Sequence, residues 1–140
     1  MPIPVRHMAP LLQVFDMPTA LRFYCDILEF KVVLTDGKPA PNNDWVLLEW
    51  EGIQIMLNTA YEAADRPAAP APTRVAAHDD TCLFFATPDV DGAYRQLRDK
   101  GLDLKEPKVA PYGMKQLWLH DPDGYGLCFQ WRADAETHEQ

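Results

Sequence analysis

The chain has 140 residues, 47% of them hydrophobic and 24% charged, which is the composition of a single ordinary globular domain. It carries 13 Lys and Arg against 21 Asp and Glu, a net charge of −8 at pH 7. Such a surface repels phosphate backbones and anionic lipids, so we expect neither a nucleic-acid nor a membrane partner. The same charge would attract a cationic small molecule, but an acidic surface also serves solubility alone.

The start of the chain and the three cysteines indicate the cellular location and the role of the thiols. The segment MPIPVRHMAP has no apolar region like that of a signal peptide, and no stretch is long enough to cross a bilayer, so we expect a cytoplasmic protein. Cys25, Cys82 and Cys128 are odd in number and lack CxxC spacing. They predict neither a disulfide framework nor a zinc ribbon, and their apolar surroundings are typical of buried thiols.

The first half of the chain predicts a strand, a helix and three further strands. In QVFDMPTALRFYCDILEF the strand turns at Asp16, and Pro18 suits the first helical position. Apolar residues then follow at helical spacing, at Leu21, Tyr24, Cys25 and Leu28. Residues 30–35 are predicted as a strand, and residues 44–58 as a hairpin that turns at Glu51 and Gly52.

The second half predicts the same order. In FFATPDVDGAYRQLRDKG we expect Thr87 to cap a helix that Pro88 opens and that ends at Gly101. A short strand is expected near residues 102–104, followed by a loop through Pro107 and Pro111. The last hairpin, MKQLWLHDPDGYGLCFQWR, turns at DPDG, whose Pro, Asp and Gly are typical turn residues.

The two halves are predicted to be copies of one unit. Asp16 and Asp89 are 73 residues apart, as are Ala20 and Ala93. The fold class is therefore expected to be α+β, with a first βαβββ module over residues 8–62 and a second over residues 80–132. An Ala- and Pro-rich, extended linker is expected over residues 63–79 and a disordered tail over residues 133–140.

Three stretches together resemble the vicinal-oxygen-chelate superfamily, which groups glyoxalase I, bleomycin-resistance proteins and extradiol dioxygenases. They are APLLQVFDMPTALRFYCDILEFKVV, TPDVDGAYRQLRDKG and DPDGYGLCFQW, and the resemblance covers roughly residues 8–132. It implies two βαβββ modules whose curled mixed sheet forms a cup with the helices on its outer face, often in a homodimer. It does not imply a reaction, because one fold hosts many activities.

Strand alternation sorts the side chains of the two hairpins into a core face and a cup face. One face is expected to pack under the helices: Val46, Leu48, Trp50, Ile53, Ile55 and Leu57 in the first hairpin, and Leu117, Leu119, Leu127, Phe129 and Trp131 in the second. The other face mixes polar and apolar groups, as a ligand cup does. The predicted ligand-binding residues on that face are Trp45, Glu49, Gln54, Met56, Cys82, Phe84, Trp118, His120 and Cys128.

The resemblance also implies four positions for a divalent metal, which catalytic members fill with His, Glu or Gln. Here these positions fall on Ala9, Met56, Cys82 and Cys128. Alanine has no donor atom, and a thioether prefers Cu(I) to Mg²⁺, Mn²⁺, Fe²⁺ or Zn²⁺. We therefore expect no metal and no other cofactor. Two thiols with His7 and His120 would be the alternative donor set for zinc.

Several residues keep two interpretations. Cys128 is either an inert filler of the cup, which its apolar neighbours favour, or a nucleophile paired with His120. His120 is either a general base or a solvated surface group. Glu49 is either a partner of a cationic ligand or a solvated surface group. Trp45 and Trp118 either stack on a ligand or pack at a dimer interface.

The leading hypothesis is a metal-free protein that binds a small organic ligand, aromatic or cationic, as bleomycin-resistance proteins sequester a drug. Flexible Met and aromatic linings suit sequestration. The alternative is a metal-dependent lyase, isomerase or dioxygenase of the same superfamily that uses His7, His120 and Glu49.

Overall fold

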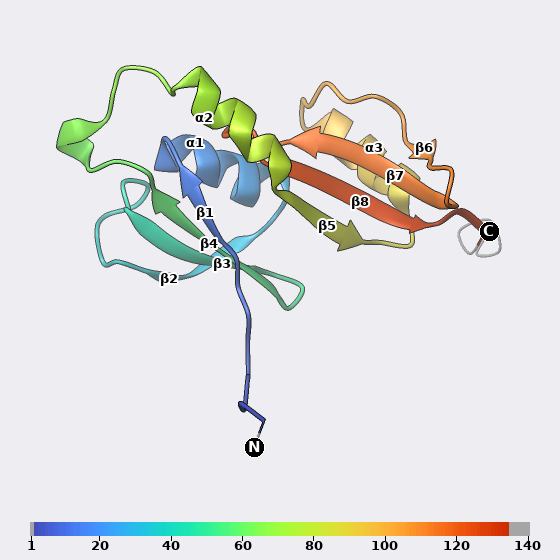
Figure 1. Cartoon of the computed structure of the whole chain (residues 1–140), viewed down its shortest axis with the longest axis horizontal. Helices are drawn as coiled ribbons and strands as arrows, with labels where there is room; N and C mark the ends of the chain where they lie inside the picture. The colour runs from blue at the N-terminus through green and yellow to red at the C-terminus, as the bar shows by residue number, and fades with distance from the viewer. Residues whose placement is uncertain (1, 135–140) are drawn as a thin grey trace. The chain divides into compact units, whose positions relative to one another are not determined.

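The computed structural model describes residues 2–134, and the chain divides into two compact units, Met1–Pro70 and Ala71–Gln140. Each unit contains one mixed four-stranded sheet with a helix on one face (Figure 1). The strand order is β1-β4-β3-β2 in the first unit and β5-β8-β7-β6 in the second. The tail expected over residues 133–140 lies, from residue 135 on, outside the described residues.

Unit 1 follows the predicted order of elements. The bounds are β1 (Leu11–Val14), α1 (Met17–Leu21), η1 (Arg22–Ile27), β2 (Lys31–Thr35), β3 (Trp45–Trp50), β4 (Ile53–Thr59) and the short 3₁₀ helix η2 (Ala63–Asp65). Strand β1 runs parallel to β4, and β3 is antiparallel to both β2 and β4. Glu51 and Gly52 have φ angles of 50° and 80°, which is the left-handed geometry that a tight two-residue hairpin turn requires.

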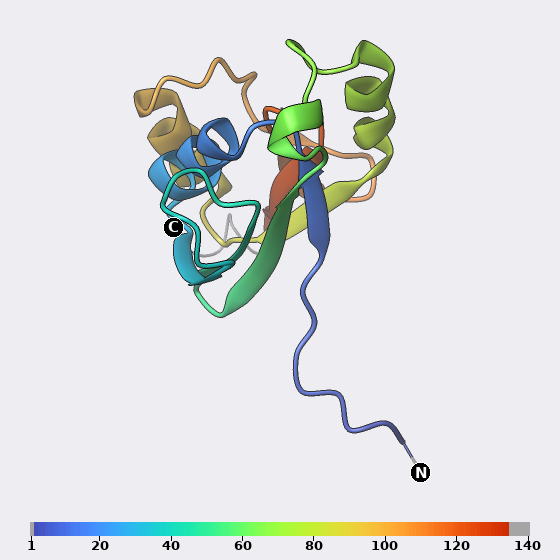
Figure 2. The same cartoon turned by 90° about the vertical axis from the view of Figure 1, so that its left-hand side faces the viewer.

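The first helix begins where the sequence predicted but ends as a wider spiral. The Asp16 carboxylate accepts a hydrogen bond from the Thr19 backbone N–H at 3.0 Å, which caps α1. Beyond it η1 is a π-helix, in which Leu28 N–H donates to the Phe23 carbonyl. Figure 2 shows α1 and η1 as consecutive turns of one blue helical ribbon. This wider spacing changes the buried stripe, so that Ala20, Phe23, Tyr24 and Leu28 are buried while Leu21 and Cys25 are only half-buried.

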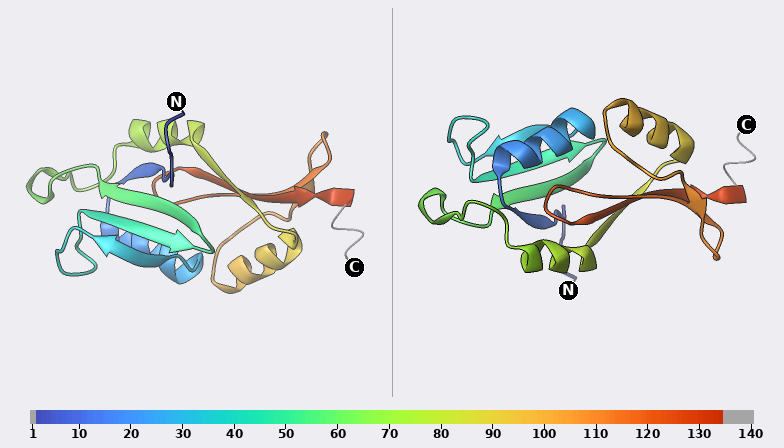
Figure 3. Two further views of the ribbon diagram at one scale, coloured as in Figure 1. Left: turned by 90° about the horizontal axis from the view of Figure 1, so that it is seen from below. Right: turned by 90° about the horizontal axis from the view of Figure 1, so that it is seen from above.

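Unit 2 repeats this arrangement after a helical connection. The bounds are α2 (Pro72–Ala77), η3 (His78–Asp80), β5 (Cys82–Ala86), α3 (Val90–Asp99), β6 (Lys108–Val109), β7 (Met114–His120) and β8 (Gly126–Arg132). Strand β5 is parallel to β8, and β7 is antiparallel to β6 and β8. Figure 3 shows α3 lying along one face of these strands.

The start of α3 differs from the sequence prediction. Asp89, not Thr87, caps the helix, because its carboxylate accepts the Gly92 N–H at 2.9 Å, and the helix begins at Val90 instead of Pro88. A side chain at Gly92 would collide with this carboxylate, since an added Cβ would lie 2.1 Å from its Oδ2 atom. The predicted end is confirmed: Gly101 follows the helix with φ of 98°, and Leu102 N–H donates to the Leu97 carbonyl.

The strand registers confirm the predicted internal repeat. In unit 1 Met56 pairs with Leu11 on one side and Leu47 on the other. In unit 2 Cys128 pairs in the same way with Phe84 and Trp118. Two βαβββ units with curled sheets are the α+β architecture that the sequence predicted.

Each sheet buries most of the face that alternation predicted; the exceptions lie near strand ends, where Ile53 is 43% exposed and Trp50 and Trp131 are half-buried. Val46, Leu48, Ile55 and Leu57 are at most 1% exposed in unit 1. In unit 2 the corresponding residues, Leu117, Leu119, Leu127 and Phe129, are at most 5% exposed. The helix contacts this face in each unit, through α1 and β4 in unit 1 and through α3, β7 and β8 in unit 2. The opposite face of each sheet, here called the open face, carries the predicted ligand-binding residues.

Two segments differ from the sequence prediction. Residues 72–77, expected to be extended, form the helix α2, in which Pro72 occupies the first helical position and the following residues carry no proline. The strand expected near residues 102–104 is wrong, since only Lys108 and Val109 form β6. Among residues 2–134, no helix is both long and apolar enough to span a bilayer.

Candidate functional site

The most developed part of the open face lies in unit 2, around two exposed aromatic side chains. Phe84 on β5 and Trp118 on β7 flank Cys128 on the central strand β8. The two rings meet edge to face with centroids 5.4 Å apart. They are 52% and 49% exposed, whereas Cys128 is 0% exposed. The predicted cup residue Cys128 therefore lies on the expected face but is covered by its cross-strand neighbours.

A hydrogen-bonded network holds Trp118 in place. The Trp118 indole N–H donates to the Gln116 side-chain oxygen at 3.2 Å. The Gln116 amide nitrogen donates in turn to the Gln130 side-chain oxygen and to the Tyr112 hydroxyl, both at 2.9 Å. Gln116 is only 7% exposed, so these bonds satisfy a buried amide and fix its orientation. The indole ring is thereby oriented before any ligand arrives.

His120 extends the open face toward the β7–β8 turn. Its Nε2 atom lies 2.6 Å from an Asp79 carboxylate oxygen, and both side chains are exposed. Next to this pair, the His78 ring stacks on Tyr125 at 4.1 Å and its Nδ1 atom lies 2.7 Å from the Asp123 carbonyl oxygen. Two contacts therefore attach η3 to the β7–β8 hairpin: His78 with Tyr125 and Asp123, and Asp79 with His120. His120 is a predicted site residue.

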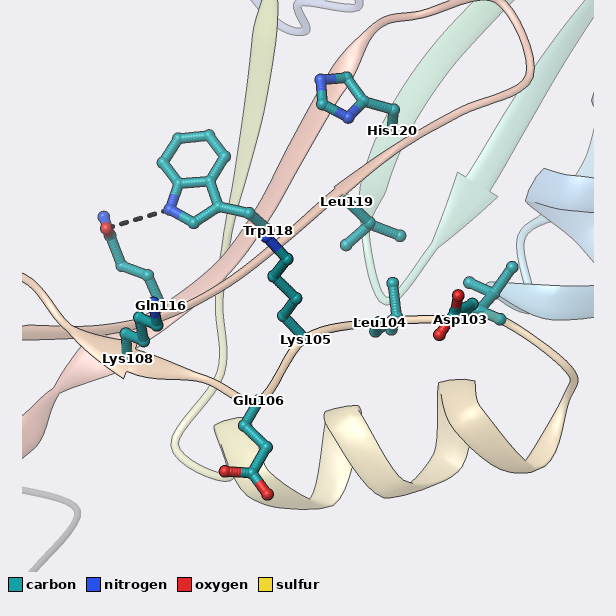
Figure 4. A pocket seen from close by; sticks show the side chains of 10 residues that line it. Asp103, Leu104, Lys105, Glu106, Lys108, Gln116, Trp118, Leu119 and His120 are labelled. Carbon is teal, nitrogen blue, oxygen red and sulfur yellow. Dashed lines mark hydrogen bonds between the residues drawn. The ribbon is translucent and has the colours of Figure 1, made fainter.

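A cavity of about 530 Å³ opens beside Trp118 (Figure 4). One wall is β7, from Gln116 to His120. The other is the irregular segment of residues 102–106 that follows α3, together with Lys108. In Figure 4 Leu104 and Leu119 face each other, while Trp118 and His120 lie on the opposite side of the strand. This volume falls in the range of small-ligand sites, and its lining is both apolar and charged.

The open face of unit 1 holds the other predicted site residues. Trp45, Glu49, Gln54 and Met56 are all half-buried, on β3 and β4. The Gln54 amide donates to the Glu49 carboxylate at 3.3 Å, across a directly opposed pair. A second such bridge joins Asn58 to Gln13 at 3.2 Å. Unit 1 therefore presents a mixed face, with two hydrogen-bonded polar pairs beside the half-buried Trp45 and Met56, whereas unit 2 presents the exposed aromatic pair.

The comparisons with known proteins agree with this architecture. A family model described as Glyoxalase/Bleomycin resistance protein/Dioxygenase superfamily matches residues 5–129. The chain belongs to this superfamily. No curated protein matches the sequence.

Several solved structures resemble the chain over nearly its whole length. TnmS3, an antibiotic binding protein from Streptomyces sp. CB03234, has 20% identity and a TM-score of 0.65, with 93% of this chain and 98% of that chain covered. A superfamily member from Sphaerobacter thermophilus has 25% identity and a TM-score of 0.62, with 91% and 98% covered. Lactoylglutathione lyase from Agrobacterium tumefaciens has 18% identity and a TM-score of 0.62, with 91% and 94% covered.

The residues at the superfamily's metal positions do not fit a divalent ion. Ala9 has no donor, and Met56 offers a thioether. Burial and the nearby Cys82 raise the pKa of the Cys128 thiol to about 11, and burial and Asp79 raise the pKa of Cys82. Because a thiol must lose its proton to bind a metal, both shifts make these thiols poorer ligands. Among residues 2–134, no group of three or more His, Cys, Asp or Glu side chains is placed to hold a metal.

Alternation predicts the face of the aromatic residues and places Gln116 and Gln130 on that same face. The role of these two amides as supports was not predicted, because it depends on a hydrogen bond between strands. Strand alternation could not identify Asp79 or the cavity wall of residues 102–106 as parts of the site, because these residues lie outside the sheet.

Proposed function

We propose that this member of the superfamily binds a small aromatic ligand on the open face of unit 2, as a sequestering protein and without a metal. The observation that carries the proposal is the Phe84–Trp118 pair, two large aromatic side chains that stay half exposed while a buried amide network fixes one of them. Exposure of large aromatic side chains to water is unfavourable in free energy. A fixed, exposed aromatic pair is therefore typical of a surface on which a ligand stacks.

The ligand class follows from the charge and the rings. A net charge of −8 favours a cation over an anion, and an indole face attracts cations as well as aromatic rings. A planar aromatic cation combines both properties. The structural neighbour TnmS3, an antibiotic binding protein, supports a binding role. The sequestering protein is proposed to act as a cytoplasmic homodimer.

The test is titration of the purified full chain with a panel of planar aromatic cations, beginning with proflavine and ethidium, followed by tryptophan fluorescence and thermal shift. Trp118→Ala should weaken the best-bound compound by roughly 10- to 100-fold, because a stacked ring contributes about 1–3 kcal/mol. Phe84→Ala should weaken it less. Tyr94→Ala, on helix α3 and outside the open face, is the matched control.

Two results would contradict the proposal. One is unchanged affinity in Trp118→Ala, which would place the ligand elsewhere on the chain. The other is a panel in which no compound raises the melting temperature, since a ligand of the native state must do so.

A further inference from the structure

The outer edge of β7 is only partly paired. Asp121 N–H donates to the Tyr125 carbonyl, and Ala133 N–H donates to the Gly113 carbonyl, so the odd-numbered residues of β7 face β8. In an antiparallel ladder the alternate residues then direct their backbone groups to the other side. On that side β6 pairs only with Lys115 and Gln116. Within residues 2–134, the backbone groups of Trp118 and His120 have no partner on this edge.

The first unit shows what normally covers this edge. There β2 pairs with β3 as far as Glu49, which is the counterpart of His120 in the internal repeat. In unit 2 the corresponding segment, residues 102–106, follows the end of α3 without forming a strand. The cavity of about 530 Å³ lies between that segment and β7 (Figure 4). An open strand edge with a walled space beside it is a template for strand addition.

We propose that this cavity binds a short extended peptide, of three or four residues, as an added strand on β7 at Trp118 and His120. Four residues of strand span about 13 Å, which matches the stretch from Leu117 to His120. Alternate side chains of the peptide meet two different walls. One is apolar, with Leu102, Leu104 and Leu119, and the other carries Trp118 and Gln116.

A second copy of the chain does not suit this edge. A stable protein interface covers about 800 Å² on each partner and involves 20–30 residues a side, whereas the free edge here offers two residues beside a cavity of small-ligand size. The proposal differs from that of the aromatic ligand above, because it relies on backbone groups of β7 and on the cavity beside them; Trp118 is the one residue that both sites use.

The first experiment is amide hydrogen exchange of the free, full-length protein by NMR. The amides of Trp118 and His120 should exchange much faster than those of Leu117 and Leu119, which bond to β8. Protection of Trp118 and His120 in the free protein would overturn the proposal, because it would show that segment 102–106 or a second copy already pairs with the edge.

The second experiment screens a library of acetylated tetrapeptide amides against the full chain and resynthesises the tightest binder. Backbone N-methylation, one position at a time, should weaken binding at least tenfold at alternate positions and leave the others within about twofold, since only alternate amides face β7. A library without a binder below 1 mM (roughly the weak limit of specific affinity), or an affinity that N-methylation changes evenly, would overturn the proposal.

Two variants separate the peptide from the aromatic ligand. Leu104→Trp fills the cavity and should abolish peptide binding while proflavine binding stays unchanged. Phe84→Ala removes part of the aromatic pair and should leave the alternating N-methylation pattern intact. Loss of peptide binding in Phe84→Ala but not in Leu104→Trp would place the peptide on the open face and overturn the strand-addition site.

Discussion

Cys128 shows how far a single residue can be predicted. Period-two alternation placed it on the open face together with Trp118, and the register confirms that the two residues are directly opposed. Its complete burial was not predictable, because the Phe84 and Trp118 rings that flank it come from strands far apart in the sequence. Burial and the nearby Cys82 raise its pKa to about 11, which favours the inert filler over the nucleophile.

The raised thiol pKa predicts how stability depends on alkaline pH. In the unfolded chain Cys128 loses its proton near pH 9.0, but in the folded protein it keeps that proton up to about 11. The unfolded state therefore binds fewer protons in this window, so the free energy of unfolding falls as pH rises from 9 to 11. In urea unfolding, Cys128→Ala should show a shallower fall than the wild type over this range.

The half-exposed Cys82 supplies the control for this pH effect. Its pKa is also raised, but it is more accessible to solvent, so Cys82→Ala should change the pH slope less than Cys128→Ala does. Equal slopes in the wild type and in Cys128→Ala would show that the buried thiol does not titrate as described.

At the scale of elements, both hairpin turns and the cap of the first helix were predicted, whereas the start of α3, the helix α2 and the strand near residues 102–104 were not. Asp16 and the two hairpin turns carry residue types whose backbone preferences act within a few positions. No such local residue preference indicates the π-helical spacing of η1 or the absence of a strand at residues 102–104. Leu102 is bonded back to the end of α3, and Pro107 has no N–H to donate, so that segment cannot enter the ladder where its Leu-Asp-Leu pattern suggested.

The two hairpin glycines predict unequal costs for the same substitution. Gly52 and Gly124 have φ angles of 80° and 91°, so alanine is strained at both by about 1–2 kcal/mol. An added Cβ at Gly52 meets nothing within 4 Å, whereas at Gly124 it would lie 2.3 Å from the Val75 backbone oxygen. Gly124→Ala should therefore lower the free energy of unfolding clearly more than Gly52→Ala in urea titrations.

The difference between these two variants measures the contact of α2 with the β7–β8 turn. If both alanine variants lose the same stability, Val75 does not lie against Gly124, and the contacts of His78 with Tyr125 and Asp123 and of Asp79 with His120 attach this segment to the turn.

At the scale of the whole molecule, the duplication was predictable because each unit repeats the same hydrophobic spacing. Both sheets carry the same strand order, and both bury the face that alternation selected. The functional difference between the units was less visible, because it depends on what stands beside each sheet. In unit 1 strand β2 covers the edge of β3, while in unit 2 a coil beside β7 leaves a cavity.

The donor chemistry predicts that chelators leave the protein unchanged. Any ion that binds the native state stabilises it, by about 2.7 kcal/mol at a concentration 100 times its dissociation constant, so its removal lowers the melting temperature by several degrees. Ala9 has no donor atom, Met56 offers only a thioether, and the raised pKa values of Cys82 and Cys128 make both thiols poor ligands. Dialysis against EDTA should therefore leave the melting temperature unchanged, and re-addition of Zn²⁺, Mn²⁺ or Ni²⁺ should not raise it. A melting temperature that falls with EDTA and recovers with one of these ions would instead favour the metal-dependent enzyme, with His7, His120 and Glu49 as the first residues to replace.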